Sequence, residues 1–369
     1  MPKLDIEKLD RYLRNAKIDP KGLRWLDPRE EPFEVLGLYW FKSEKRWHRL
    51  PLKAEKCGIR PPVLELACCT AGGQLRFRTD SCRIVLSVRT VSEAYTPGRS
   101  GFDLYTGELG NELFWSSARP AIGQKEYSSE LFHVSERKMR EFRLNFPLYN
   151  GVEELSVGLE EGVSLLPPAP LPVKKPVVIY GTSITQGGCA SRAGSAFTNQ
   201  LSRRLQAEFL NFGFSGNGQN EPEMAQLLAE IEEPAMFIID SEANSVSAEL
   251  IRERVPRFLS ILREKHPQVP IVIVTKVPYG PRYACEIPVL KEEFRTIYEA
   301  RKRSGDRNIY FVDGTAFWSG DDYTENTIDG AHPTDLGFTR MADKLEPVLR
   351  QLMEQYGLCP GKQNGHQHI

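Results

Sequence analysis

The 369-residue sequence carries almost no net charge, because 48 Lys and Arg residues are balanced by 49 Asp and Glu residues. Proteins that hold nucleic acid or an anionic membrane surface through phosphate contacts usually have a clear excess of basic side chains. The sequence also lacks any apolar run of the roughly 20 residues that cross a bilayer. We therefore expect neither a nucleic-acid partner nor a membrane partner.

Cysteine is scarce, and its seven residues are odd in number and scattered along the chain. Cys68 and Cys69 are adjacent, and no Cys-x-x-Cys pair supplies the ligand spacing of a zinc site. The opening segment has no apolar core of the kind found in secretory signals. These features predict a cytoplasmic protein with neither a disulfide framework nor a bound metal.

The residues that are present form two halves with different periodicities. In the first 150 residues, short runs of aromatic and β-branched residues are separated by Gly, Pro, Asp and Ser, which is typical of antiparallel strands. The runs lie at residues 33–40, 75–77, 83–89, 131–134 and 140–146. They predict an all-β sandwich or jelly roll, with a short helix at residues 6–15 in front of it.

A proline-rich segment separates the two halves. Residues 165–176 contain five prolines, and proline stiffens an extended chain without donating to a β-ladder. We predict a linker here, with an edge strand followed by a loop as the alternative. The predicted domains are an N-terminal β-sandwich at residues 1–172, an α/β domain at 173–357 and a flexible tail at 358–369.

Beyond residue 176, apolar strands alternate with amphipathic helices. The predicted strands are residues 177–180, 210–212, 236–240, 271–276 and 309–313, and the predicted helices are 195–209, 222–231, 248–265, 287–303 and 334–354. This alternation indicates parallel βαβ units whose sheet is covered on both faces. The expected fold is a three-layer α/β/α domain with a five-stranded parallel sheet.

Polar residues follow these predicted strands at the edge where parallel sheets bind ligands. Ser183 follows the first strand, and Asp329 and His332 follow the fifth after a long loop. A serine becomes a strong nucleophile when an adjacent histidine takes its proton, and a carboxylate orients that histidine. The three residues therefore predict acyl transfer through an acyl-enzyme, without a metal or an organic cofactor.

A tetrahedral intermediate also needs hydrogen-bond donors for its oxyanion. The backbone N–H groups of Ser183 and Gly216 and the side-chain amide of Asn244 would supply three, because all follow strands at the same edge. Gly216 could instead be an ordinary loop glycine, and Asn244 could simply end a strand through an Asx-type turn.

Other interpretations of residues 181–187 fail on spacing. A Walker loop needs a lysine that is absent, and the dinucleotide fingerprint Gly-x-Gly-x-x-Gly is absent because Ser183 stands where its second glycine belongs. The nucleophile elbow Gly-x-Ser-x-Gly needs a second glycine where Thr185 stands. A Gly-x-Ser turn alone is most often a plain turn, so the prediction depends on the other residues at this edge.

Together these segments resemble the four sequence blocks of the SGNH (GDSL) hydrolases, in order and spacing. Residues 181–187 resemble the first block, the loop of Gly216 the second, Asn244 the third and residues 329–333 the last. The resemblance implies a three-layer α/β fold with a Ser-His-Asp triad and a Ser-Gly-Asn oxyanion hole.

Two positions depart from the pattern of the family. Thr182 stands where an aspartate usually precedes the nucleophile, so we expect the turn to lose an acceptor. The usual Gly-x-Asn-Asp of the third block reads Glu242-Ala-Asn244-Ser, which keeps the amide but shapes the turn differently. Neither change removes a catalytic role.

The N-terminal half carries a second resemblance. Gly101-Phe-Asp-Leu-Tyr105 is similar to the Gly-x-Asp-Leu-Tyr signature of a β-sandwich domain that precedes some SGNH domains, in bacterial esterases and a few acyltransferases. Asp103 and Tyr105 either stabilise the sandwich or face the cleft and help to select substrate. Trp318, Tyr279 and Tyr323 are candidate aromatic walls for a sugar or aryl group, with simple packing as the alternative.

We expect a serine esterase that removes short acyl groups, in the simplest case acetyl, from a small-molecule or carbohydrate ester. An acyltransferase that passes the acyl group to an alcohol is the nearest alternative. A catalytically inactive carbohydrate-binding protein is a third alternative, disfavoured by the presence of Ser183, Asn244, Asp329 and His332. A homo-oligomer is compatible with the sequence.

Overall fold

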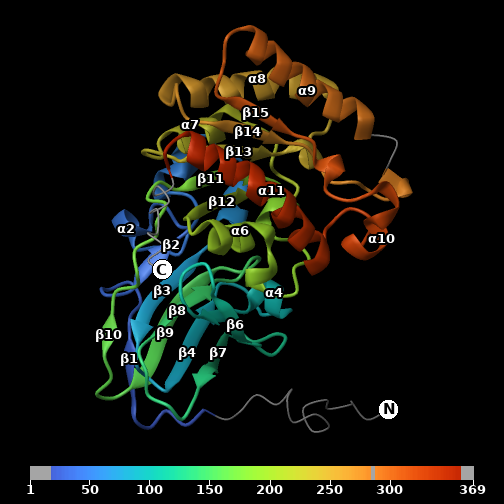
Figure 1. The fold of residues 1–369 in the computed structure, drawn as a ribbon. Coiled ribbons are helices and arrows are strands. Elements are labelled where there is room, and N and C mark those ends of the chain that lie inside the picture. Colours follow the sequence, from blue (N-terminus) through green and yellow to red (C-terminus); the bar gives the residue numbers. More distant parts are fainter. Residues whose placement is uncertain (1–17, 284–286, 359–369) are drawn as a thin grey trace, which may run out of the picture.

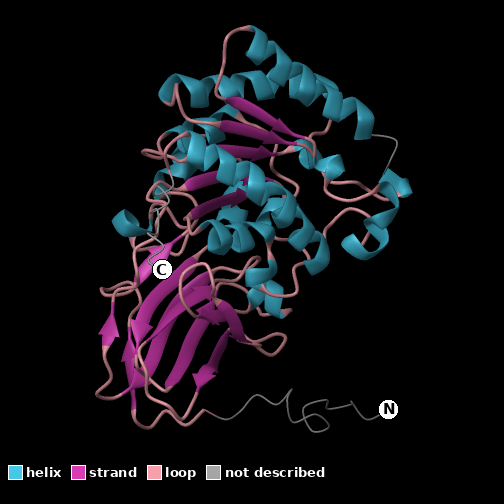
Figure 2. Cartoon of the chain, in the orientation of Figure 1, coloured by secondary structure: helices cyan, strands magenta, loops and turns pink. Residues whose placement is uncertain are grey.

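The computed structural model describes residues 18–283 and 287–358; the predicted helix at 6–15 and the tail from residue 359 lie outside this range. An antiparallel β region comes first and an α/β region second, and the two are stacked end to end (Figure 1). Figure 2 shows the contrast: strands dominate one end, and helices surround a second, separate sheet at the other.

The β region consists of two antiparallel sheets that face each other. One has the order β1 (Leu23–Leu26), β9 (Val152–Glu160), β4 (Arg83–Thr90), β7 (Glu126–His133). The other has the order β10 (Leu165–Leu166), β3 (Gln74–Thr79), β8 (Arg140–Asn145), β5 (Asp103–Thr106), β6 (Leu113–Ser117), and β2 (Glu34–Leu36) also pairs with β3. Alternate residues such as Leu86 and Leu144 fill one core between the sheets. The predicted β-sandwich is confirmed.

The strands differ from the predicted runs in several places: β1, β5 and β6 lie outside those runs, and β7 begins at Glu126 rather than at residue 131. The apolar run at 33–40 forms only β2 as strand, because Gly37 turns the chain with a φ of +79° and α2 (Phe41–Glu44) follows. The sequence analysis missed β9, which begins just after the predicted β segment. Its solvent-facing Glu153 and Glu154 interrupt the apolar pattern, although Val157 and Leu159 are buried in the sandwich core.

The α/β region contains a five-stranded parallel sheet with the order β12, β11, β13, β14, β15. These strands are β11 (Val177–Gly181), β12 (Phe209–Gly213), β13 (Met236–Asp240), β14 (Ile271–Val274) and β15 (Ile309–Val312). One face packs on α6 (Phe197–Leu205) and α11 (Asp335–Gln355), the other on α7 (Pro222–Ala229), α8 (Ala248–Lys265) and α9 (Ile287–Arg303) (Figure 1). Ile179 is buried toward the first face and Val178 toward the second, so both faces are covered. This confirms the predicted three-layer α/β/α fold.

β11 comes first along the chain but lies between β12 and β13 in the sheet. The chain therefore adds β12 on one side of β11 and the remaining strands on the other side. In open α/β sheets, ligands bind beside the carboxyl ends of the strands at this switch point. Ser183 follows β11 and Asn244 follows β13, which borders β11 on the other side of the switch. The topology therefore positions the predicted site.

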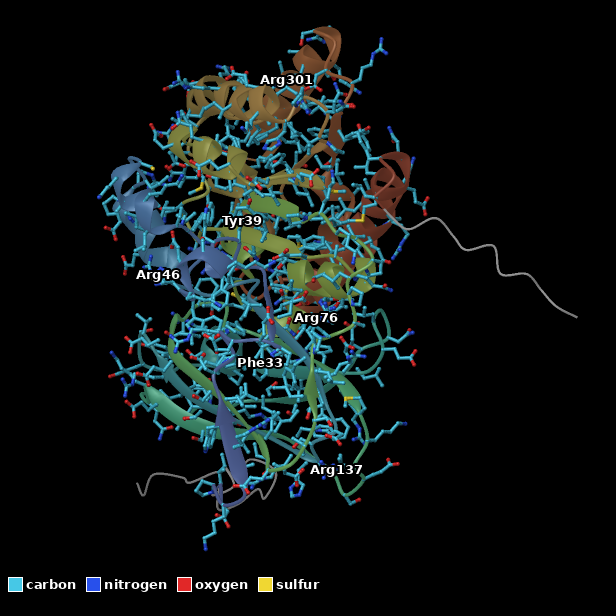
Figure 3. The ribbon with its side chains drawn as sticks, turned by 90° about the vertical axis from the view of Figure 1, so that its left-hand side faces the viewer. Phe33, Tyr39, Arg46, Arg76, Arg137 and Arg301 are labelled. Carbon is cyan, nitrogen blue, oxygen red and sulfur yellow. The ribbon has the colours of Figure 1, made fainter. Side chains whose placement is uncertain are left out.

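The N-terminal half also packs against the α/β sheet. Residues of η2 (Leu52–Lys56) and α3 (Pro61–Ala67), which the sequence analysis did not predict, share a hydrophobic core with α7 and α8. Figure 3 shows Arg76 near the border of the two regions, with Arg137 and Arg301 toward opposite ends of the molecule. Within the described residues, no helix combines the length and apolar character required to cross a membrane.

Candidate active site

Ser183 is the first residue of a short helix, α5 (Ser183–Gln186), directly after β11. Thr182 caps this helix: its Oγ1 accepts the N–H of Ile184 at 3.3 Å, while its own N–H donates to Thr185 Oγ1 at 3.2 Å. Such reciprocal caps satisfy backbone donors that a helix start would leave unpaired. Thr182 therefore supplies the acceptor that we expected the turn to lose without the aspartate.

Ser183, His332 and Asp329 lie in one hydrogen-bonded row. Ser183 Oγ is 2.9 Å from His332 Nε2, and His332 Nδ1 is 2.8 Å from Asp329 Oδ2. Ser183 is largely buried, with 8% of its surface exposed. This is the order of nucleophile, base and orienting carboxylate that serine hydrolases require.

The carboxylate of Asp329 is held by the tight turn that leads to the histidine. Its Oδ1 accepts the backbone N–H groups of Ala331 and His332 at 2.9 and 2.8 Å. Burial raises the pKa of Asp329, but hydrogen bonds from the backbone and side chain of His332 and from Ala331 outweigh this effect and hold the pKa below its usual value. The carboxylate is thus ionised where the imidazole needs an acceptor.

The turn itself is fixed by neighbouring backbone. Gly330 adopts a φ of +89°, which favours glycine, and its carbonyl accepts the N–H of Gly280 at 2.7 Å. Ile328 N–H donates to the carbonyl of His332 at 2.9 Å. The loop after β14 and the turn at 328–332 therefore support each other.

Two of the three predicted oxyanion donors lie in turns that follow the strands on either side of β11. Gly216 occupies a turn after β12 with a φ of +69°, and Asn244 ends the turn η4 (Glu242–Asn244) after β13. Gly218 N–H donates to Asn244 Oδ1 at 3.1 Å, which orients the amide and leaves Nδ2 as its donor. A Cβ on Gly218 would lie 2.3 Å from the carbonyl oxygen of Gly181, so only glycine allows this approach.

The three predicted aromatic walls have different environments. Trp318 is 5% exposed and belongs to the hydrophobic core, which favours the packing alternative for this residue. Tyr279 is partly buried, its ring 5.9 Å from that of Tyr283. Tyr323 packs against Gly280, where an added Cβ would lie 2.9 Å from its ring. Tyr279 and Tyr323 thus border the loop that supports the histidine turn, and their contact with substrate stays a prediction.

Asp103 and Tyr105 do not face an open cleft. They are 0% and 3% exposed, and both accept hydrogen bonds from Arg192, which follows the nucleophile helix in the chain. The substrate-binding interpretation is therefore wrong for both, and the structural alternative describes them better. Their side chains join the β-sandwich to the loop at residues 191–195.

Sequence reasoning missed two residues from the N-terminal half that support the site. Arg49 is 1% exposed, and its guanidinium donates to the carbonyls of Asn211 and Gly213 at 3.2 and 2.5 Å, at the end of β12. Tyr149 donates its hydroxyl to the carbonyl of Ser183 at 3.2 Å. No local pattern marks either residue, because both contacts join segments far apart in the sequence.

A buried carboxyl group lies behind the nucleophile turn. Thr185 Oγ1 donates to Asp240 Oδ2 at 2.7 Å, which ties α5 to the end of β13. Burial raises the pKa of Asp240 to about 7, with the nearby Glu242 adding to the effect and the Thr185 hydrogen bond opposing it. Burial also raises the pKa of Glu242 to about 7, although it accepts the N–H of Lys276 at 3.0 Å.

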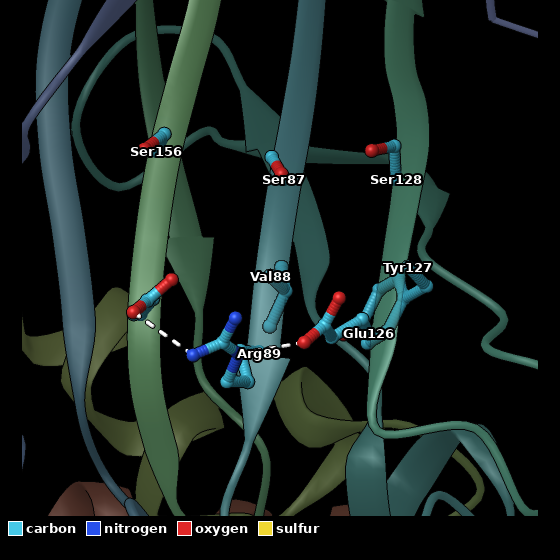
Figure 4. A pocket seen from close by; sticks show the side chains of 8 residues that line it. Ser87, Val88, Arg89, Glu126, Tyr127, Ser128 and Ser156 are labelled. Atoms are coloured by element: carbon cyan, nitrogen blue, oxygen red, sulfur yellow. Dashed lines mark hydrogen bonds and ion pairs between the residues drawn. The ribbon is translucent and has the colours of Figure 1, made fainter.

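A separate hollow of about 300 Å³ lies on the outer face of the four-stranded sheet (Figure 4). Ser156, Ser87 and Ser128 form a row across three strands, and Arg89 pairs with two glutamates beside them. None of the described residues that line it is a histidine, so it offers no imidazole base for acyl transfer. Within the described parts of the chain, no group of three or more His, Cys, Asp or Glu residues could hold a metal ion.

Comparison with known families matches both regions. The model of the GDSL-like lipase/acylhydrolase family covers residues 174–350, and the model of the N-terminus of SGNH-hydrolase-type esterases, named for its GxDLY motif, covers residues 23–165. The chain is a two-domain SGNH hydrolase. Its activity class is carboxylic ester hydrolysis.

Solved structures show the same architecture. A protein of Bacteroides ovatus described as a GDSL-like lipase is 28% identical with a TM-score of 0.82, over 90% of this chain and 98% of its own. A salicylyl-acyltransferase from a tetracycline biosynthetic pathway is 18% identical, with a TM-score of 0.74, over 91% of this chain and 98% of its own. An acetyl xylan esterase from the rumen bacterium Butyrivibrio proteoclasticus is 15% identical, with a TM-score of 0.57, over 91% of this chain and 99% of its own. The last two likenesses concern the fold alone. No curated protein matches the chain.

Proposed function

We propose that this SGNH hydrolase cleaves short acyl esters through an acyl-enzyme on Ser183. The Ser183 hydroxyl attacks the ester carbonyl while His332 Nε2 takes its proton, and Asp329 stabilises the imidazolium that forms. The tetrahedral intermediate collapses when His332 returns the proton to the leaving alcohol. Water then attacks the acyl-enzyme, gives a proton to His332 and releases the acid as Ser183 regains its hydrogen.

One observation carries this proposal: the unbroken row of hydrogen bonds at 2.9 and 2.8 Å from Ser183 through His332 to Asp329. Both distances are within the range for proton transfer between positioned groups. The orientation of Asn244, fixed by Gly218, supports its role as an oxyanion donor together with the backbone N–H groups of Ser183 and Gly216.

We further propose that the substrate is an acetylated carbohydrate. Several solved structures with this fold are carbohydrate esterases, among them the acetyl xylan esterase and a Clostridium thermocellum enzyme solved with cellohexaose. Because fold alone does not determine substrate, this assignment needs a direct test. The similarity to a salicylyl-acyltransferase keeps transfer to an alcohol as the second candidate.

The test is a hydrolysis panel of p-nitrophenyl esters and acetylated sugars, run with the natural sequence and with Ser183→Ala. The proposal predicts release of acetate from short esters and loss of turnover in the variant by several orders of magnitude. Turnover that survives in Ser183→Ala would disprove the mechanism. Adding alcohols and measuring transfer product distinguishes the acyltransferase: a transfer rate well above the rate of hydrolysis would favour it.

A further inference from the structure

We infer that Asp103 of the β-sandwich is a positioning residue for His332, acting through the loop at residues 191–195. This inference rests on the proposed function, because it concerns the group that we propose as the catalytic base. It assigns the N-terminal domain a part in the geometry of the triad.

The carboxylate of Asp103 binds the backbone of this loop. It is fully buried on β5, accepts the backbone N–H of Gly194 at 2.9 Å and accepts from Arg192 Nη1 at 2.8 Å. A Cβ on Gly194 would lie 2.6 Å from both Asp103 Oδ2 and the Tyr105 ring, so the loop backbone is pressed directly onto β5. Arg192 also stacks over Phe114 at 4.1 Å from the ring centroid. The loop has little freedom to shift against the sandwich.

A second contact from the sandwich lies just before this point. Gly98 in α4 (Pro97–Ser100) packs closely against the backbone of Ala190. A Cβ on Gly98 would lie 1.9 Å from the carbonyl oxygen of Ala190. Ala190 precedes Ser191, and Gly187 and Gly188 before it both donate to the carbonyl of Ser183. The loop is therefore fixed on one side by the sandwich and on the other by the nucleophile turn.

The same loop holds the helix that follows the histidine. Ser191 N–H donates to Asp335 Oδ1 at 2.8 Å, and Ser191 Oγ donates to Asp335 Oδ2. Asp335 is the first residue of α11 and lies three residues after His332. Thr334 N–H donates to the carbonyl of Asn326 at 2.9 Å, so the segment from 332 to 335 is held from both sides.

A displacement of loop 191–195 would therefore move Asp335 and, with it, His332. Proton transfer requires the base within hydrogen-bonding reach of Ser183, and an error of about 1 Å can reduce the rate by about 100-fold. Asp103 reaches His332 only through the loop, so its loss should reduce the chemical step more than substrate binding.

The test compares Asp103→Asn with a matched control, Glu141→Gln. Glu141 lies in the same sheet and pairs with the buried Arg76 at 3.0 Å, but it contacts neither loop 191–195 nor the triad. With p-nitrophenyl acetate, we expect Asp103→Asn to lower kcat about tenfold or more while KM stays within about threefold. Glu141→Gln should keep kcat within about twofold. Equal losses in both variants, or an unchanged kcat in Asp103→Asn, would overturn the inference.

Two further variants keep the test decisive if Asp103→Asn folds poorly. Ser191→Ala and Asp335→Ala alter the exposed end of the same connection, and each should also lower kcat at nearly constant KM. When Asp103→Asn is folded, a double-mutant cycle adds a third measurement. Because Asp103 and Asp335 act on one path, the double variant Asp103→Asn/Asp335→Ala should lose less activity than the product of the single losses. Additive losses, or full activity in both Ser191→Ala and Asp335→Ala, would contradict the connection. The proposed function fails separately, if Ser183→Ala remains active.

Discussion

Tyr149 donates a hydrogen bond of 3.2 Å to the carbonyl of Ser183, so a residue of the N-terminal half touches the backbone of the proposed nucleophile. The same hydroxyl packs against Gly188, because a Cβ added to Gly188 would lie 2.7 Å from the Tyr149 oxygen. Asp103 and Arg49 make comparable contacts with the loops around the site. The β-sandwich of this enzyme is therefore built into the support of the site, in addition to any contact with substrate.

Replacing Tyr149 with phenylalanine tests this support. The variant keeps the ring but removes one donor, and the N–H of Gly188 still bonds the Ser183 carbonyl at 2.8 Å. We expect a loss of stability of about 1 kcal/mol and a several-fold loss of kcat with little change in KM. Urea unfolding and steady-state kinetics would measure both. A variant with unchanged stability and unchanged kcat would mean that the hydrogen bond supports nothing.

Asn244 offers a prediction about the oxyanion. Asn244→Ala removes the amide donor, and we expect kcat to fall by about 100- to 1000-fold. The N–H of Gly218 loses its acceptor as well, so stability should be measured in parallel. If kcat stays within about threefold of the natural enzyme, Asn244 does not stabilise the oxyanion.

Asp240 should make stability depend on pH. Its pKa is raised to about 7 in the folded protein, mainly by burial, whereas an unfolded aspartate titrates near 3.9. Between these pH values the folded state holds a proton that the unfolded state has lost, so stability falls as pH rises from about 4 to about 7. Glu242 contributes in the same direction, because its pKa is also raised to about 7.

The variant Asp240→Asn removes the contribution of Asp240 to this pH dependence of stability. The asparagine side chain can still accept the hydrogen bond from the Thr185 hydroxyl. We expect the variant to gain stability relative to the natural protein as pH rises, on the order of 1 kcal/mol or more by pH 8, and to show the smallest gain at pH 5. Urea unfolding at both pH values gives the difference. A constant difference at the two pH values would contradict the assignment.

The sequence predicted the α/β region well because its signals are local. Strands buried on both faces read as continuous apolar runs, and β13 (Met236–Asp240) and α8 (Ala248–Lys265) have the predicted boundaries. The helix predicted at 195–209 ends at Leu205, because Gln206 adopts a left-handed φ of +51° and β12 needs the residues that follow. Ser183, Asp329 and His332 were found because strand order alone brings their loops to one edge.

The contacts that support the site could not be predicted in this way. Arg49, Asp103 and Tyr149 each bond backbone groups more than 30 residues away, so their roles depend on how the sandwich packs on the α/β sheet. Trp318 shows a related ambiguity. An aromatic residue in a loop before the histidine is compatible with a substrate wall or with core packing, and only the tertiary structure shows that it is buried.

The most direct measurement of the central claim is the mass of the intact enzyme after rapid mixing with p-nitrophenyl acetate and acid quenching, followed by mapping of the modified peptide. We predict one acetyl group per chain, on Ser183, formed at a rate that accounts for turnover, and no such adduct in Ser183→Ala. Acetyl on another residue at that rate, or turnover without any adduct in a variant lacking Ser183, would contradict the proposed mechanism.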